Sequence, residues 1–204
     1  MLVRSPALSR RSVTEQIIKQ SRNWSEFWDA LVQLDDISQQ GDTFERLTQL
    51  YLQTQPEYQS KLRSVWRWSE VPDEVRARLG LPATDEGIDI LAETFQGELW
   101  AIQCKFHSNP DRAVTRQELG TFVALASVAG LSQRVVAHTS SKPIRKRALM
   151  GETVEIGLDR WLTLEQEQWS LITAALQGRA ARPEPRLPRL HQQEALAAAR
   201  AHWS

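Results

Sequence analysis

The chain has 204 residues, hydrophobic residues at 41% of positions and a formal net charge of +0 at pH 7, a composition typical of a globular protein with one well-buried core. A single cysteine excludes an internal disulfide, and no apolar run has the roughly 20 residues of a membrane span or the pattern of a signal peptide. We therefore expect a cytoplasmic protein without membrane contact. Its neutral overall charge provides no general attraction to nucleic acid.

The sequence pattern predicts helices in the N-terminal third of the chain, after a first stretch without clear periodicity. Residues 1–22 begin with a polar, basic stretch, and we expect them to be disordered or loosely packed apart from a short helix near 13–20. Apolar residues recur at helical spacing over 24–34. A connection at 38–41 then leads to a helix that we expect to begin at Asp42, because aspartate is a good N-cap.

Tryptophans and charged residues dominate the stretch from 60 to 80. Residues 65–68 are compatible with a first strand or with the end of a helix, and a helix is expected from Pro72 to Gly80. Trp66 and Trp68 have rings suited to base stacking, but packing in a core is the commoner use of tryptophan. We assign them no role in a site.

Residues 85–106 read DEGIDILAETFQGELWAIQCKF and contain two strand-like runs joined at Gly97, which is typical of an antiparallel hairpin. Side chains of a strand point alternately to its two faces. One face of the second run is apolar, and consists of Trp100, Ile102, Cys104 and Phe106. We expect that face to pack and the opposite face, which carries Gln103 and Lys105, to remain available for chemistry.

The length of the hairpin loop decides where Asp89 lies. A two-residue turn sets Asp89 opposite Cys104, whereas a three-residue loop at 95–97 sets it opposite Gln103. Three-residue loops commonly end in a left-handed residue, for which a glycine is suited, and this loop ends in one. We therefore predict the longer loop, which gathers Asp89, Gln103 and Lys105 on one face.

The pattern of Asp89 followed one hairpin later by Gln103-Cys104-Lys105 resembles the PD-(D/E)xK nucleases. The GIDI and QCK segments are similar to the Mrr branch of that family, in which Gln replaces the usual acid. The alternative is a hairpin that merely carries an Asp and a Lys. The resemblance implies an α/β fold, a restriction-endonuclease-like sandwich with a central mixed sheet flanked by helices, which also suits the order of the expected elements. We place this nuclease domain at residues 23–177.

The resemblance implies a Mg²⁺ site built from oxygen ligands. Asp89 is then the bridging metal ligand, Gln103 a neutral oxygen ligand or an orienter of water, and Lys105 the group that positions the attacking water or stabilises charge on the phosphate. In the family, an early-helix Glu in a G-x-x-FE context contributes to the metal site. The segment GDTFE matches it, so Glu45 is the candidate third ligand. Its alternative role is a helix-start carboxylate favoured by the helix dipole.

Weaker candidates lie on either side of the hairpin. The family carries a Gln or Glu on the helix after the Lys strand. Gln117 and Glu118 stand there, on a helix expected near 115–128, and Gln117 is the candidate. Asp85 is close enough in sequence to replace the missing acid, although a solvated acid at a hairpin end is the plainer interpretation. A short strand, RVVAHTSS, and a basic helix, SKPIRKRALM, follow. The candidate DNA contacts are Lys142, Arg145 and Lys146, unless these form an ordinary solvated face.

The C-terminal part of the sequence begins with a strand, VEIGL, and a helix, LEQEQWSLITAAL, with Thr163 and Gln166 as a possible capping box. Residues 178–189 are rich in Pro and Arg and are expected to form a linker. Residues 190–204 resemble the opening segment of superfamily-two helicases, in which Gln192 would read adenine. The alternative is an ordinary amphipathic helix.

These features together predict a Mg²⁺-dependent endonuclease that acts on double-stranded DNA. The nuclease pattern followed by a helicase start is similar to the N-terminus of single-polypeptide restriction enzymes, which implies ATP use by a downstream helicase domain and allows a methyltransferase domain. A different class of function remains open, namely a catalytically silent module of the same fold that binds DNA or docks neighbouring domains. Asp89 and Lys105 held close together would favour the enzyme.

Overall fold

The computed structural model describes residues 9–80, 87–125, 131–145 and 153–179. Within these residues one five-stranded sheet runs in the order β1-β2-β3-β4-β5. The strands are β1 (Leu62–Arg67), β2 (Ile90–Thr94), β3 (Leu99–Lys105), β4 (Leu131–His138) and β5 (Thr153–Ile156). Strands β1 to β3 are antiparallel neighbours, whereas β3, β4 and β5 are parallel. The predicted mixed α/β sheet is therefore confirmed.

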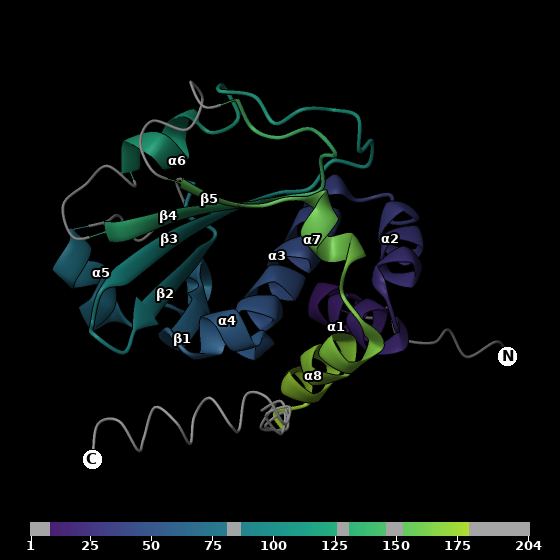
Figure 1. Ribbon diagram of the computed structural model, residues 1–204, viewed down its shortest axis with the longest axis horizontal. Coiled ribbons are helices and arrows are strands. Elements are labelled where there is room, and N and C mark those ends of the chain that lie inside the picture. Colours follow the sequence, from purple (N-terminus) through teal and green to yellow (C-terminus); the bar gives the residue numbers. More distant parts are fainter. Residues whose placement is uncertain (1–8, 81–86, 126–130, 146–152, 180–204) are drawn as a thin grey trace, which may run out of the picture.

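Helices cover both faces of this sheet (Figure 1). The larger layer comprises α1 (Arg10–Gln20), α2 (Trp24–Val32), α3 (Ile37–Thr54), α4 (Pro56–Gln59), α7 (Leu158–Leu162) and α8 (Gln166–Leu176). The smaller layer comprises the 3-10 turn η1 (Trp68–Glu70), α5 (Asp73–Leu79) and α6 (Gly120–Leu125). Among the residues in these ranges, no helix combines the length and the apolar character needed to cross a membrane.

Each face of the sheet contributes to its own apolar core. Ile102 and Cys104 of β3 pack in the core beneath α3 and α8, whereas Leu99 and Ala101 pack in the core beneath α5 and α6. The expectation that one face of β3 is left free for chemistry is therefore wrong for most of the strand. The reason is that parallel strands need crossover connections, and these bring helices onto the second face as well.

Helix α3 begins at Ile37, five residues before the predicted start at Asp42. The cap is Asp36, whose carboxylate accepts hydrogen bonds from the backbone N–H groups of Ser38 and Gln39. Gly41 lies inside the helix in open space, and its cost of about 1 kcal/mol is tolerated because the amphipathic face of α3 is buried on both sides of it.

The predicted loose packing of residues 1–22 is wrong for the part that forms α1. Ile18 is fully buried in the core, and Ile17 packs beside it. A polar contact adds to this packing, since the Gln39 amide donates to the Thr14 hydroxyl, which in turn bonds the hydroxyl of Thr43 at 2.9 Å. Helix α1 is therefore part of the larger apolar core.

Two smaller expectations also need correction. Helix α6 is described from Gly120, after a turn, instead of from about residue 115. The capping box of α8 pairs Glu165 with Gln168 and not Thr163 with Gln166. Trp66 and Trp68 pack in or against the smaller core, in agreement with the absence of a site role for them.

Trp161 of α7 joins the sheet to the helical layer. Its ring stacks on Trp24 at 5.7 Å and meets the edges of Phe44 at 5.4 Å and Tyr51 at 4.9 Å. Its indole N–H donates to the carbonyl of His138 at the end of β4, at 2.9 Å. This fully buried side chain therefore fixes α7 to the strand ends.

We predict that Trp161→Ala destabilises the protein by about 3–5 kcal/mol, because it empties a large volume in the core and leaves the His138 carbonyl without its donor. Urea unfolding followed by circular dichroism measures the change. The matched control is Leu162→Ala, since Leu162 is the next residue but is 63% exposed, and its effect should stay within about 0.5 kcal/mol. Equal effects of the two changes would contradict this account of the core.

Candidate active site

The hairpin has the predicted register. Ile90 pairs with Ile102 and Glu93 pairs with Leu99, so the next position along sets Asp89 opposite Gln103. The loop comprises residues 95–97, because Thr94 N–H donates to the carbonyl of Glu98. Gly97 has φ +82, the left-handed conformation that a three-residue loop needs at its end. The predicted loop length and pairing are therefore confirmed.

The carboxylate of Asp89 lies at the centre of this hairpin end. Its Oδ2 accepts a hydrogen bond from the Gln103 amide at 2.9 Å and one from the backbone N–H of Cys104 at 2.5 Å. Asp89 is 7% exposed and Gln103 is 4% exposed. A buried carboxylate needs such donors because an unpaired charge in an apolar surrounding is costly. The contact therefore holds these two side chains in fixed mutual positions.

Glu45 and Lys105 belong to elements on different sides of the sheet. Lys105 is the last residue of β3 and shares the face of Gln103 by alternation. Glu45 belongs to α3, which covers the opposite face. The two faces meet only where the strands end, so a site that uses both residues has to lie at that end.

The buried thiol of Cys104 reports this convergence. Burial raises its pKa well above the ordinary value, and the charges of Asp89 and then Glu45 raise it further, whereas a hydrogen bond with Thr48 and the charge of Lys105 lower it. Three predicted site residues therefore act electrostatically on one atom. The thiol itself is held protonated, in agreement with a packing role.

The residues of this end suit a hard divalent cation by the chemistry of their donors. Two carboxylates and an amide carbonyl are oxygen ligands of the kind that Mg²⁺ prefers. Gln103 donates its NH₂ group to Asp89, which leaves its amide oxygen as the atom that can bind a cation. Among the residues that the structure describes, no group of three or more His, Cys, Asp or Glu side chains gathers as a metal site.

Gln117 does not point into this end of the sheet. It is exposed, in the turn that precedes α6, and the neighbouring Glu118 makes the inward contacts instead. Glu118 and Thr115 form a reciprocal capping box, in which Glu118 accepts from the Thr115 N–H at 2.9 Å and Thr115 Oγ1 accepts from the Glu118 N–H at 3.3 Å. The T-x-x-E spacing is the sequence signal that identifies Glu118 as the structured acid of the pair.

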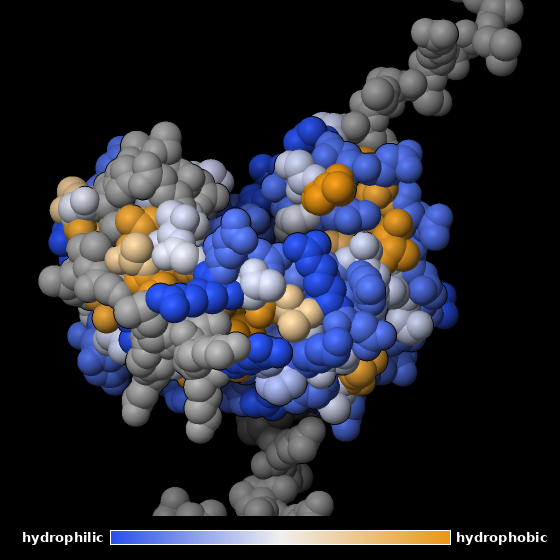
Figure 2. Space-filling view, turned by 90° about the horizontal axis from the view of Figure 1, so that it is seen from above, coloured by the Kyte–Doolittle hydropathy of each residue, from blue (hydrophilic) through white to orange (hydrophobic). Residues whose placement is uncertain are grey.

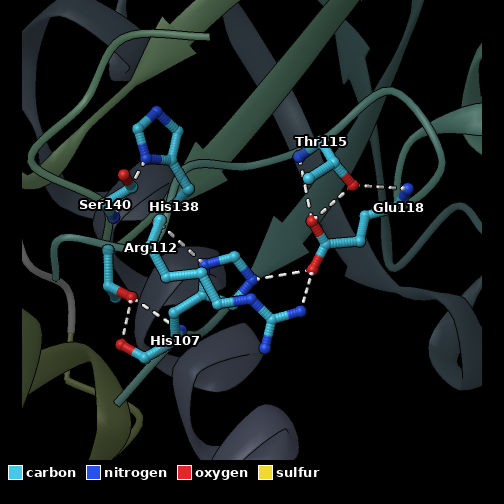
Figure 3. A network of polar contacts seen from close by, with 7 residues as sticks. His107, Arg112, Thr115, Glu118, His138 and Ser140 are labelled. Carbon is cyan, nitrogen blue, oxygen red and sulfur yellow. Dashed lines mark hydrogen bonds and ion pairs between the residues drawn. The ribbon is translucent and has the colours of Figure 1, made fainter. Parts of the chain in front are cut away.

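A network of polar contacts surrounds Glu118 (Figure 3). Besides Thr115, its carboxylate contacts His107 Nε2 at 2.9 Å and Arg112 Nη2 at 2.8 Å. Burial opposes ionisation, but the hydrogen bonds from Thr115 and His107 outweigh it and lower the pKa of Glu118 to about 2. The network ties the segment after Lys105 to the start of α6. Nothing in the sequence pattern alone identified His107 as part of it.

The candidate DNA contacts follow β4 at the same end. Lys142 and Arg145 are exposed, on a segment that is fastened by the Ser141 N–H bond to the Pro110 carbonyl at 2.8 Å. Figure 2 looks onto the molecule from above Figure 1, where hydrophilic residues cover much of the surface and apolar ones form small separate groups. Lys146, Asp85 and Gln192 lie outside the described residues.

Comparison with known proteins relates this chain and its fold to nucleases. A family model described as a restriction endonuclease, Mrr_cat_2, matches residues 53–170. The structure is similar to that of the ATP-dependent Type ISP restriction-modification enzyme LlaBIII bound to DNA, at 28% identity and a TM-score of 0.58. That match covers 86% of this chain and 11% of the other.

A second structure, MspJI restriction endonuclease in complex with a 27-mer oligonucleotide, matches at 10% identity and a TM-score of 0.46. The match covers 96% of this chain and 43% of that one. No curated protein matches the chain. This chain thus spans about a tenth of the length of the first structure and less than half of the length of the second.

We predict that the ionised carboxylate of Glu118 stabilises the fold and that this contribution is lost at acidic pH. Its folded pKa of about 2 lies below the ordinary value of 4.5, so its contribution is complete above pH 4.5 and is lost as the pH falls toward 2. The difference in free energy of unfolding between wild type and Glu118→Gln, measured in urea, should shrink over that range. Glu167→Gln, which changes an exposed carboxylate of α8, serves as the control. A difference that is independent of pH would contradict the prediction.

Proposed function

This chain belongs to the restriction endonuclease family Mrr_cat_2, and from that premise we propose that it is a Mg²⁺-dependent DNA endonuclease module of a larger ATP-dependent restriction enzyme. The observation that carries the proposal is the buried contact of Gln103 with Asp89, at the strand end that Lys105 closes. In a hairpin that carried an Asp and a Lys by chance, the Asp would have no reason to be buried against the amide of a Gln.

Each residue of this site has a distinct proposed role. Asp89, Glu45 and Gln103 would hold Mg²⁺, which when bound supplies charge stabilisation for the phosphodiester and a water of lowered pKa. Lys105 would place its ammonium group against the scissile phosphate, where negative charge grows during hydrolysis. Asp89, fixed by the Cys104 N–H, keeps its carboxylate in place without reorganisation.

Gln103 makes the site less acidic than one with a third carboxylate. An amide oxygen is a ligand without charge, so the binding of Mg²⁺ by these residues alone should be weak. Phosphate oxygens of bound DNA would complete the ligand set. We therefore expect metal affinity to rise when DNA is present.

Double-stranded DNA would reach the site along the segments that follow β3 and β4. Lys142 and Arg145 are exposed on the second of these segments, and Lys146 follows in the sequence. Their cations would neutralise backbone phosphates and set the position of the duplex, without reading its sequence. The Type ISP enzyme that this chain resembles is bound to DNA in its structure, which supports the same class of partner here.

Coupling to a motor is the second part of the proposal. The ATP-dependent enzyme that this chain resembles is far longer, since the match covers 11% of it. We propose that residues 1–22 together with 23–177 form the nuclease module, that 178–189 act as a linker, and that 190–204 begin a helicase-like domain in which Gln192 contacts ATP. A motor would hold DNA beside the nuclease at high effective concentration. A methyltransferase domain in the same polypeptide is compatible with this arrangement.

Replacement of Asp89 tests the site directly. We predict that Asp89→Ala lowers the rate of plasmid nicking in Mg²⁺ by roughly 10²-fold or more, because it removes the central ligand of the charge-stabilising group. The variant should lose about 1–3 kcal/mol of stability, since two buried donors lose their acceptor. The assay uses the longer enzyme that carries this chain, at a temperature where circular dichroism shows both proteins folded.

Asp73→Ala is the matched control, because Asp73 is exposed on α5, and it should nick plasmid at the wild-type rate. Nicking by Asp89→Ala at the rate of this control would place the active site elsewhere. If wild type itself bound DNA but did not nick it under any condition, the alternative of a silent DNA-binding module would replace the endonuclease.

We predict that the 204-residue chain alone cleaves DNA at least roughly tenfold more slowly than the longer enzyme with ATP. Its net charge is zero, and non-specific DNA affinity depends on phosphate neutralisation that salt weakens steeply. The measurement compares plasmid cleavage by the two proteins in Mg²⁺ at physiological salt. Equal rates would point to an independent nuclease that needs no motor.

A further inference from the structure

Two histidines stand at the ends of adjacent strands, and their hydrogen bonds require different protonation states. His107 follows β3 and is 6% exposed, whereas His138 ends β4 and is 1% exposed. His138 is the register partner of Lys105 in the parallel pair β3–β4. Both rings contact a carboxylate. Their second nitrogens have partners of opposite kind, the Arg112 carbonyl for His107 and the Ser140 N–H for His138 (Figure 3).

Both ring nitrogens of His107 face groups that only accept. Nδ1 lies 3.2 Å from the carbonyl oxygen of Arg112, and Nε2 lies 2.9 Å from Oε1 of Glu118. A carbonyl has no proton to donate, and the carboxylate of Glu118 is ionised at neutral pH. Two hydrogen bonds to two acceptors need two N–H groups. The geometry of His107 is therefore that of an imidazolium.

His138 provides the contrast. Its Nδ1 contacts the backbone N–H of Ser140 at 3.2 Å, and a backbone N–H can only donate. Nδ1 is thus an acceptor without a proton, and Nε2 carries the N–H that donates to Glu155 at 2.8 Å. The geometry of His138 is therefore that of a neutral ring in one tautomer.

The backbone of His107 is joined to the end of the strand that carries Lys105. The His107 N–H donates to Thr139 Oγ1 at 2.8 Å, and that hydroxyl donates to the His107 carbonyl at 3.0 Å. The N–H of Thr139 donates to the carbonyl of Lys105 at 3.2 Å. Thr139 is completely buried. The backbone of His107 and the carbonyl of Lys105 are thus both hydrogen-bonded to one residue, Thr139.

We propose that His107, as an imidazolium paired with Glu118, is a positioning residue that holds Lys105 in place for phosphodiester cleavage. The proposal rests on the endonuclease function proposed above, and it deepens that function by adding a charged group that touches neither DNA nor metal. His107 fixes the segment after β3 on one side through Arg112 and Glu118, and on the other through Thr139. Lys105 lies two residues before His107 in the chain, so its backbone position is restricted by the same contacts.

The charged groups around His107 determine what loss of its proton does. From its own segment the guanidinium of Arg112 faces it, from the start of α6 the carboxylate of Glu118 does, and Lys105 lies on the preceding strand. Arg112 already shares Oε1 of Glu118 with His107. A neutral His107 therefore leaves Glu118 paired with Arg112, while one of the two ring contacts is lost. The segment loosens locally, and the fold persists.

The first experiment reads the protonation state without any activity. Long-range ¹H–¹⁵N correlation spectra of this chain, labelled on histidine, separate an imidazolium from either neutral tautomer. At neutral pH we expect both nitrogens of His107 to carry protons, while His138 shows one protonated and one bare nitrogen. A neutral ring at position 107 under those conditions would overturn the proposal.

The second experiment uses one substitution at both histidines. In His138→Gln the amide NH₂ and oxygen can replace the donor and the acceptor of a neutral ring, so this control should cleave DNA at the wild-type rate. In His107→Gln the amide oxygen faces the Arg112 carbonyl and cannot donate. We expect the single-turnover rate of His107→Gln to fall roughly tenfold to a hundredfold, with DNA affinity unchanged.

The pH profile and a second pair of variants separate positioning from general structural damage. The wild-type rate should fall at the pH where the spectra show His107 losing its proton, and this step should be missing in His107→Gln. Thr139→Val, which keeps the shape of Thr139 but removes its hydroxyl, should lower the rate in the same way. Retention of the wild-type pH step by His107→Gln would assign the step to another group and refute the proposal.

The two proposals fail in different ways. If wild type does not cleave DNA, the endonuclease function is wrong, and the proposed role of His107 in cleavage falls with it, whereas the protonation result stands by itself. If wild type cleaves and His107→Gln cleaves as fast as His138→Gln, the function holds and the positioning role is refuted. The backbone amide signal of Lys105 adds a further test, since it should shift in His107→Gln and stay in place in His138→Gln.

Discussion

The buried carboxylate of Asp89 is the constraint on which the candidate site depends. A carboxylate that is 7% exposed needs hydrogen-bond donors around it, and Gln103 and the Cys104 backbone provide them from the neighbouring strand. These donors are available only in one register, which the three-residue loop ending in Gly97 sets. The loop length therefore sets the register, and the register sets which donors the carboxylate of Asp89 meets. A change in the loop would change both.

Helices on both sides of the sheet explain why the site lies at the strand ends. Leu99 and Ala101 pack in one core, and Ile102 and Cys104 pack in the other, so the middle of β3 has no surface for a substrate. Polar side chains can emerge only past the last buried pair. Glu45 of the helical layer and Lys105 of the opposite face could both contribute to a site only there.

The strand ends are also where the connecting segments are most firmly fastened. The contact between His107 and Glu118 holds the segment after β3. The segment after β4 is held by Glu155, which contacts His138 and also accepts from the Ile144 N–H at 3.1 Å. Trp161 adds a donor to the His138 carbonyl from the far side. A loop fixed by charged hydrogen bonds can hold a lysine more precisely than a loop held by backbone contacts alone.

The sequence by itself determined the features that depend on local pattern. Alternation in the hairpin and a glycine at the end of a three-residue loop predicted the pairing of Asp89 with Gln103, and the order of the elements predicted the mixed sheet, because register and layer order follow from short-range geometry. Only the tertiary structure decided the burial of Ile18 in the larger core and the burial of Leu99 and Ala101 on the second face of β3. Each of these depends on partners far away in the chain. A residue's own neighbours in sequence do not show whether a distant side chain supplies the hydrogen bond or the apolar surface that stabilises it.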